Sequence, residues 1–381
     1  MGSETCIRDS VWSLLPKEIY GNYKYVLSLA GMVGALMLSG MGTAILRSVA
    51  RGFEGAIRHG LGLYARFSLL GASTALVTAL YYWLNDNNTL ALSLLIAGIS
   101  LPIFNSAALF QPILVGHKEF KLHAKYTIIK NLVPTILLIS VATLVNDSVP
   151  LLVLVYFFGY ATTTYVLLRL TLRRFPPNDK LDEKDIIYGK HLSVMNAFSL
   201  VAEQLDKVLI FQLVGAVEVA VYAFAEAMPK QIHRFFKMTR SLIFPKFSAN
   251  HKSLSFKNIL YKSSLFTAVI IAVVLCYILL AELIFTFLFP AYTEAILFSQ
   301  ILALQLIPLA FGFFPGVALK ASRAQKKLYI HSVIVPAINI TVLIGLVYFY
   351  GVLGAVYARI IGRTVSASLS VVLFYLHQRG R

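Results

Sequence analysis

The residues of this chain best suited to do chemistry are charged side chains that recur at helical spacing inside apolar segments. In the second half of the chain they are Glu226, Lys230 and Arg234, followed by Arg359 and Arg363. Residues four apart lie on one face of a helix. Ionisable groups at bilayer depth are costly and usually face a bundle interior or a water-filled cavity. These stripes therefore predict a polar passage through apolar surroundings.

A third stripe lies in segment 190–214, where Glu203 is followed by Asp206 and Lys207. Lys207 is four residues after Glu203, a spacing at which the two charges can pair. Such a pair can be purely structural, and that alternative remains open.

The deep cations outnumber the deep anions. Five positive residues, Lys207, Lys230, Arg234, Arg359 and Arg363, stand against Glu203, Asp206 and Glu226. An excess of positive charge favours phosphate or uronate groups, which arginine can bind through two hydrogen bonds. Lys237, Arg240 and Arg47 lie near the expected helix ends, where side chains that extend to the interface are the alternative.

The composition places the helices that carry these stripes in lipid. Of the 381 residues 58% are hydrophobic and 13% charged, against about 25% charged in soluble domains, and the mean hydropathy is +0.75. The net charge of +17 comes from Lys and Arg in short loops between apolar runs. This distribution is typical of membrane topology signals and argues against nucleic acid as a partner.

We expect an all-α integral membrane protein with about eleven spanning helices, each of about 20 apolar residues. The expected spans are 23–46, 64–84, 89–115, 126–145, 149–168, 190–214, 217–244, 263–288, 294–319, 328–350 and 352–376. Lys and Arg concentrate in alternate loops, and the loops between them contain neither residue. The positive-inside rule then predicts a cytoplasmic C-terminus.

The polar stretch around Pro176-Pro177 predicts two halves, because adjacent prolines cannot continue a helix. We expect an N-terminal bundle of five helices over 1–170, a cytoplasmic linker over 171–189 and a C-terminal six-helix bundle over 190–381. Weak similarities at an offset near 200 residues indicate that the halves are repeats, a plan common in transporters.

Motifs for catalysis are missing from the sequence, which contains no Walker A sequence, HExxH or G-x-S-x-G. Cys6 and Cys276 are far apart and support neither a disulfide nor a metal site. We therefore expect no catalytic residues, no metal, no cofactor and no enzymatic activity.

Several segments resemble the polysaccharide-transport flippases of the multidrug/oligosaccharidyl-lipid/polysaccharide (MOP) exporter superfamily. The similarity is carried by Leu14–Tyr23, Gly40–Arg47, Leu205–Ile210, Val221–Ala223 and Tyr350–Val356. Compared with twelve-helix members, the chain shows the pattern expected without the first helix.

The resemblance implies two bundles that form a V and carry a polyprenyl-diphosphate-linked oligosaccharide across the cytoplasmic (inner) membrane by alternating access. It implies surface-polysaccharide biosynthesis, such as that of O-antigen or exopolysaccharide, with membrane lipid and a polysaccharide polymerase or glycosyltransferases as partners. We expect Lys207, Arg234, Arg359 and Arg363 to line the substrate path. Glu203, Asp206, Glu226 and Lys230 are candidates for charge pairing or ion coupling.

Two other functions compete with this hypothesis. A cation-coupled multidrug antiporter of the same superfamily would favour deep acidic groups, whereas the deep charge here is slightly positive. A membrane polysaccharide polymerase or ligase would need a large outer loop with Arg or His, and the expected outer loops are short.

Overall fold

The structure is a computed structural model that describes residues 15–145, 147–249, 255–322 and 325–379. Within these ranges the regular elements are all helices, which confirms the all-α prediction. The chain divides into two compact units, Met1–Val208 and Leu209–Arg381. The expected division into bundles over 1–170 and 190–381, with a linker over 171–189, stays a prediction.

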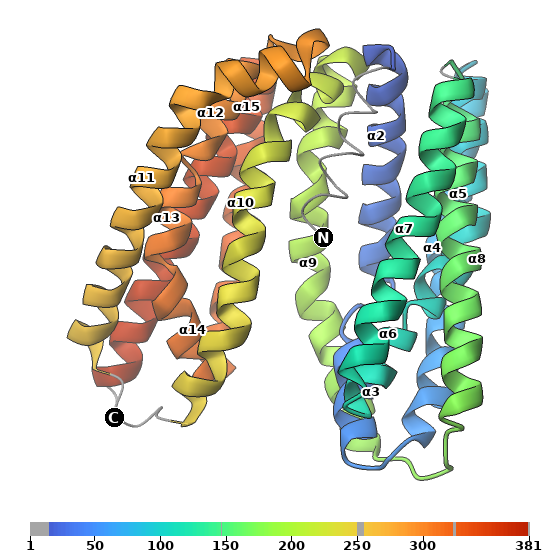
Figure 1. The fold of residues 1–381 in the computed structure, drawn as a ribbon, viewed down its shortest axis with the longest axis vertical. Coiled ribbons are helices and arrows are strands. Elements are labelled where there is room, and N and C mark those ends of the chain that lie inside the picture. Colours follow the sequence, from blue (N-terminus) through green and yellow to red (C-terminus); the bar gives the residue numbers. More distant parts are fainter. Residues whose placement is uncertain (1–14, 146, 250–254, 323–324, 380–381) are drawn as a thin grey trace. The chain divides into compact units, whose positions relative to one another are not determined.

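The first unit contains long helices joined by short turns (Figure 1). They are α2 (Lys17–Val33), η1 (Gly34–Leu36), α3 (Met41–Ala50), α4 (Gly55–Leu84), α5 (Asn88–Ala107), α6 (Phe110–Gly116), α7 (Phe120–Leu144), α8 (Val149–Arg174) and α9 (Glu183–Leu213), whose last residues belong to the second unit. The α2 helix begins directly after Pro16, which has the extended backbone that proline favours. Helices α2 and α3 meet at a bend of 56°.

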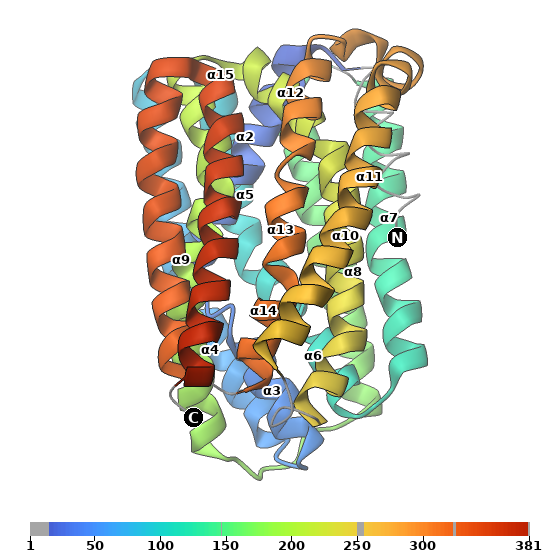
Figure 2. The same cartoon turned by 90° about the vertical axis from the view of Figure 1, so that its left-hand side faces the viewer.

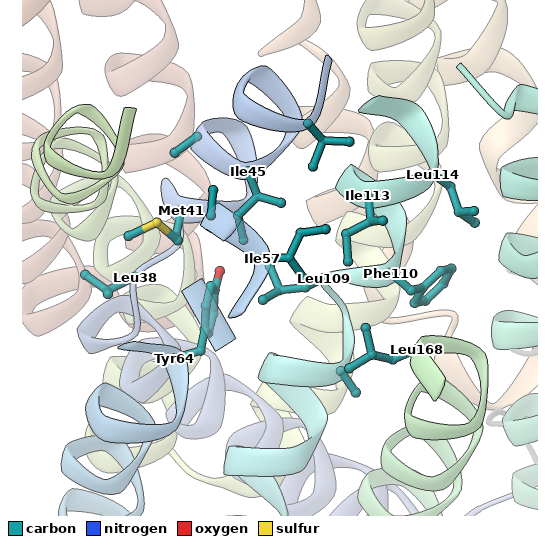
Figure 3. Close-up of a cluster of buried hydrophobic side chains, with 14 of the residues drawn as sticks. Leu38, Met41, Ile45, Ile57, Tyr64, Leu109, Phe110, Ile113, Leu114 and Leu168 are labelled. Carbon is teal, nitrogen blue, oxygen red and sulfur yellow. The ribbon is translucent and has the colours of Figure 1, made fainter. Parts of the chain in front are cut away.

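Apolar side chains fill the interior of the first unit at one end of its helices. Figure 3 shows Ile45 of α3 directed toward Ile57 of α4, with Leu109 beside Ile57 and with Met41 and Tyr64 in the same cluster. Outside this core, many large apolar side chains of the long helices remain exposed. Because that exposure would be unfavourable in water, it is typical of helices that face lipid.

The second unit contains another set of helices with its own apolar core. They are α10 (Ala216–Ala249), α11 (Phe256–Leu288), η3 (Pro290–Tyr292), α12 (Ala295–Ala303), α13 (Leu306–Phe311), α14 (Phe313–Ala321) and α15 (Gln325–Arg379). Phe236 of α10 packs against Phe266 of α11 and Phe313 of α14 through edge-to-face ring contacts. These contacts hold α10 against the rest of its unit.

Helix α15 is a hairpin of two helical arms, which lie side by side in Figure 2. As a single straight helix, its 55 residues would extend about 80 Å, far more than a bilayer core of about 30 Å. The turn is at Gly351, whose φ of 56° and ψ of −130° are not helical. His331 of the first arm lies 3.2 Å from the hydroxyls of Ser366 and Ser370 on the second. The two spans expected at 328–350 and 352–376 correspond to these arms.

Six helices of the described residues are long and apolar enough to cross a membrane, or up to eight if each bent pair is one span. This set counts α15 once and does not include α9 or α10, whose charged stripes lower their hydropathy. The chain is therefore a multi-pass membrane protein. Each expected span overlaps one or more helices, with breaks such as those at 37–40 inside the span 23–46 and at 304–305 inside the span 294–319. The count of about eleven stays a prediction.

Candidate functional site

The centre of the candidate site is Glu226 of α10, whose side chain is 5% exposed. Its Oε2 lies 2.5 Å from the Nζ of Lys230, one helical turn further on. Its Oε1 lies 3.6 Å from Nη2 of Arg359 on the second arm of α15. One buried carboxylate thus joins cations from two helices that are far apart in the sequence.

Tyr222 extends this cluster toward the start of α10. Its hydroxyl accepts a hydrogen bond of 3.4 Å from Nε of Arg359, and its side chain is buried. The guanidinium of Arg359, with 15% of the side chain exposed, is therefore oriented by a carboxylate and a phenol together. We call Tyr222, Glu226, Lys230 and Arg359 the Glu226 cluster.

The Glu226 cluster contains two cations for one carboxylate. A buried charge is tolerated when it is paired and hydrogen-bonded, and Glu226 fulfils that condition for Arg359. The Lys230 side chain is 46% exposed, so it stays accessible while paired. The cluster can therefore offer positive charge to an anionic group while its own carboxylate holds the cations in place.

The other predicted cations of this unit lie close in sequence to the cluster. Arg363 is one turn after Arg359 on the same arm of α15 and is half-buried. Arg234 is one turn after Lys230 on α10, is exposed, and donates a hydrogen bond of 2.9 Å to Gln231. Helical spacing thus places Arg363 and Arg234 on the faces that carry Arg359 and Lys230.

The stripe on α9 contains an ion pair between two adjacent residues. Asp206 and Lys207 are both buried, and their Oδ1 and Nζ atoms lie 3.5 Å apart. Oδ1 of Asp206 also accepts a hydrogen bond of 2.8 Å from the backbone N–H of Lys207. Glu203, the partner favoured by the four-residue spacing, is exposed. Adjacent residues normally point in different directions on a helix, so spacing did not predict this ion pair.

A third buried carboxylate, Asp185 of α9, was not predicted as a site. Its Oδ2 accepts hydrogen bonds of 2.8 Å from Ser48 and 3.2 Å from Arg51, and its Oδ1 lies 3.1 Å from Nε of Arg47. Arg51 also pairs with Asp182 at 2.9 Å. Arg47 is thus an ion-pair partner in the fold. We call Arg47, Ser48, Arg51, Asp182 and Asp185 the Asp185 cluster.

Further hydrogen bonds tie the segment between α8 and α9 to the same end of the first unit. Glu54 accepts from the backbone N–H of Asn178 at 3.2 Å and lies 2.9 Å from Nε2 of His117. The backbone N–H of Gly55 donates to the carbonyl of Lys180 at 2.9 Å. The sequence signal was the recurrence of Arg in one loop and of Asp in another. Charge spacing along a single helix does not reveal that the two loops pair.

Metal binding finds no support in the described parts of the chain, where no group of three or more His, Cys, Asp or Glu residues is placed to hold an ion.

Solved structures with this fold are transporters of the MOP superfamily. An inward-facing multidrug resistance MATE transporter has a TM-score of 0.74 at 14% identity, covering 99% of this chain and 94% of the other. The lipid II flippase MurJ in an inward closed conformation has a TM-score of 0.70 at 15% identity, with 99% and 85% covered.

A third match is a MOP transporter from Pyrococcus furiosus in which reversed polarity of the binding pocket suggests a different function. Its TM-score is 0.65 at 15% identity, with 98% of this chain and 91% of that chain covered. No curated protein sequence matches the chain.

The chain thus has the multi-pass helical fold of these transporters. Residues 13–251, more than half of the chain, match the family described as polysaccharide biosynthesis protein, and the chain belongs to that family. This match confirms the family resemblance stated from sequence.

Proposed function

We propose that this protein is a flippase that moves a polyprenyl-diphosphate-linked oligosaccharide across the cytoplasmic membrane by alternating access during surface-polysaccharide synthesis. The observation that carries the proposal is the Glu226 cluster, in which two cations surround one buried carboxylate. An excess of positive charge suits a diphosphate or a uronate. The family match supports polysaccharide synthesis as the setting, and the lipid II flippase MurJ supports a lipid-linked substrate.

Within this proposal Arg359 and Arg363 contact the anionic part of the substrate, together with Lys207 and Arg234. Glu226 and Lys230 hold Arg359 in position, while Glu203 and Asp206 stay candidates for charge pairing or ion coupling. Partner glycosyltransferases and a polysaccharide polymerase would supply and consume the lipid-linked unit.

Surface-glycan display in a host that lacks its own flippase tests the proposal. We expect Arg359→Ala and Arg363→Ala each to lower display about tenfold or more, because a hydrogen bond to a charged group contributes about 1.5–3 kcal/mol. Lys257→Ala is the matched control, since Lys257 is an exposed cation at the start of α11. Normal display with both arginine variants, at equal protein level, would contradict the proposal.

The second candidate function is a cation-coupled multidrug antiporter, favoured by the buried carboxylates Glu226 and Asp206 and by the similarity to MATE transporters. It predicts efflux of a cationic dye such as ethidium that is lost in Glu226→Gln. The flippase proposal predicts no such efflux and a loss of glycan display when Arg359 is replaced.

The proposed orientation has a cytoplasmic C-terminus. In a variant with Cys6 and Cys276 replaced by Ser, we expect Asn87→Cys to react with a membrane-impermeant maleimide in intact cells. Ser322→Cys should react only after permeabilisation. The reverse labelling pattern would show that the orientation in the membrane is opposite to the one proposed.

A further inference from the structure

The first unit contains a buried hydroxyl that makes no hydrogen bond with the described part of the chain. Oγ1 of Thr127, on α7, is buried and has no partner among the described residues. Hydroxyls in apolar helices usually donate to the carbonyl of the preceding turn. Ser140 and Thr143 on the same helix do so, at 3.0 and 3.2 Å. The Thr127 hydroxyl therefore departs from the rule that its own helix follows.

One turn after Thr127 is Lys130, a half-buried cation about 15 Å along α7. Helices α5, α6, α7 and α8 contain no Asp or Glu. The described residues provide Lys130 with no ion pair, and α7 packs against α6 and α8, which lack carboxylates. A lysine that reached the interface along lipid would be exposed, as Lys125 is.

Pro134 fixes the face on which these groups lie. Pro134 is seven residues after Thr127, two turns along the same face, and is buried opposite Gly159 of α8, where an added Cβ would lie 3.5 Å from its Cβ. As a proline it has no N–H for the carbonyl of Lys130, four residues before it. The α8 side of α7 therefore presents a hydroxyl, an ammonium and a carbonyl that lacks its helical donor.

Helix α8 adds a further hydroxyl at the same level. Because α7 and α8 run antiparallel and meet at Pro134 and Gly159, Thr163 lies across from Lys130. Thr162 and Thr164 donate to carbonyls of the preceding turn at 2.7 and 2.6 Å. Thr163 is half-buried and shows no such bond among the described residues.

We infer that Thr127, Lys130 and Thr163 form a phosphate-binding subsite within the first unit, in addition to the Glu226 cluster. The ammonium would pair with a phosphate oxygen, the two hydroxyls would donate to its other oxygens, and the Lys130 carbonyl would accept from a hydroxyl of an attached sugar. This inference deepens the proposed function and rests on it. The phosphate can come from a lipid diphosphate or from a free phosphate.

Binding to the purified full chain in detergent tests the inference. The probes are undecaprenyl diphosphate and inorganic pyrophosphate, with the uncharged alcohol undecaprenol as reference. We expect Lys130→Ala to raise the Kd for undecaprenyl diphosphate about tenfold or more, since it removes one charge-assisted hydrogen bond. Lys130→Arg should retain most of the affinity. Lys125→Ala is the control that removes an equal charge from an exposed position of the same helix.

The outcomes separate the subsite from the flippase. Equal Kd values for wild type, Lys130→Ala and Lys125→Ala would overturn the subsite and leave the proposed function standing. A failure of the wild type to bind either probe would overturn the subsite and count against a diphosphate-linked substrate as well. Pyrophosphate binding that depends on Lys130 without binding of the lipid would support the subsite with free phosphate as its ligand. Glycan display judges the flippase separately, and thermal unfolding of Lys130→Ala verifies that the variant is folded.

Discussion

The Glu226 cluster and the Asp185 cluster each pair a buried carboxylate with two cations, but the cations differ in their exposure to solvent. Each has one carboxylate that is almost completely buried, with 5% of the Glu226 and 2% of the Asp185 side chain exposed, and each carboxylate faces two cations. At Asp185 both cations, Arg47 and Arg51, are about half exposed, and Asp182 supplies a second carboxylate. At Glu226 the more buried cation is Arg359, at 15% exposure.

The difference indicates different roles. Half-exposed cations with one carboxylate for each cation are typical of an ion-pair network that stabilises the fold at the end of a helix bundle. At Glu226 a nearly buried guanidinium shares one carboxylate with a lysine. Within the proposed function, the Asp185 cluster stabilises the fold and the Glu226 cluster binds the substrate.

The largest effect on stability should come from Glu226→Ala. It leaves Arg359 buried without its carboxylate, and breaking a buried pair in this way costs about 3–5 kcal/mol. Thermal unfolding in detergent should show a lower midpoint than for Glu226→Asp, which retains the charge. A midpoint equal to that of the wild type would mean that Arg359 does not depend on Glu226.

Asp185→Asn should have a smaller effect, about 1–2 kcal/mol, because Arg47 and Arg51 can regain water when their partner is neutral. The loss should shrink at high salt, since half-exposed charges are screened. Unfolding at low and high NaCl measures both. Glycan display should be retained at a temperature where the variant is folded, and its complete loss there would give this cluster a direct part in transport.

The smallest effect should come from Tyr222→Phe. It removes one long hydrogen bond to Arg359 and keeps the ring, so the stability cost should be about 0.5–1 kcal/mol. Affinity for the anionic substrate should fall only slightly, as measured by display at limiting substrate. An effect as large as that of Arg359→Ala would place Tyr222 in the binding site itself.

Much of the fold followed from the sequence because apolar length and helical spacing are local properties. The helix break at Gly351, between the spans expected at 328–350 and 352–376, and the Glu226–Lys230 pair at a four-residue spacing were accessible in this way. The contact between Glu226 and Arg359 could not be predicted from helical spacing, because the two residues are separated by more than 100 positions in the sequence.

Charge spacing along the helices did not predict Lys130 or Asp185 as sites, for different reasons. Lys130 is a single cation in its span and forms no stripe, so only the unpartnered Thr127 and the absence of carboxylates on its packing helices draw attention to it. Asp185 lay in a segment expected to be a linker, where its charge looked like part of a solvated run. Its burial depends on α3, which meets it through Ser48.

The fastening of residues 178–185 to the first unit has a practical consequence for anyone who modifies this protein. A tether with many bonds to its own bundle is a poor place for a protease to cut or for a reporter to be inserted, because both require the backbone to open locally. Tags placed there would disturb Glu54, Gly55 and Asp185 together, however hydrophilic the stretch looks in the sequence.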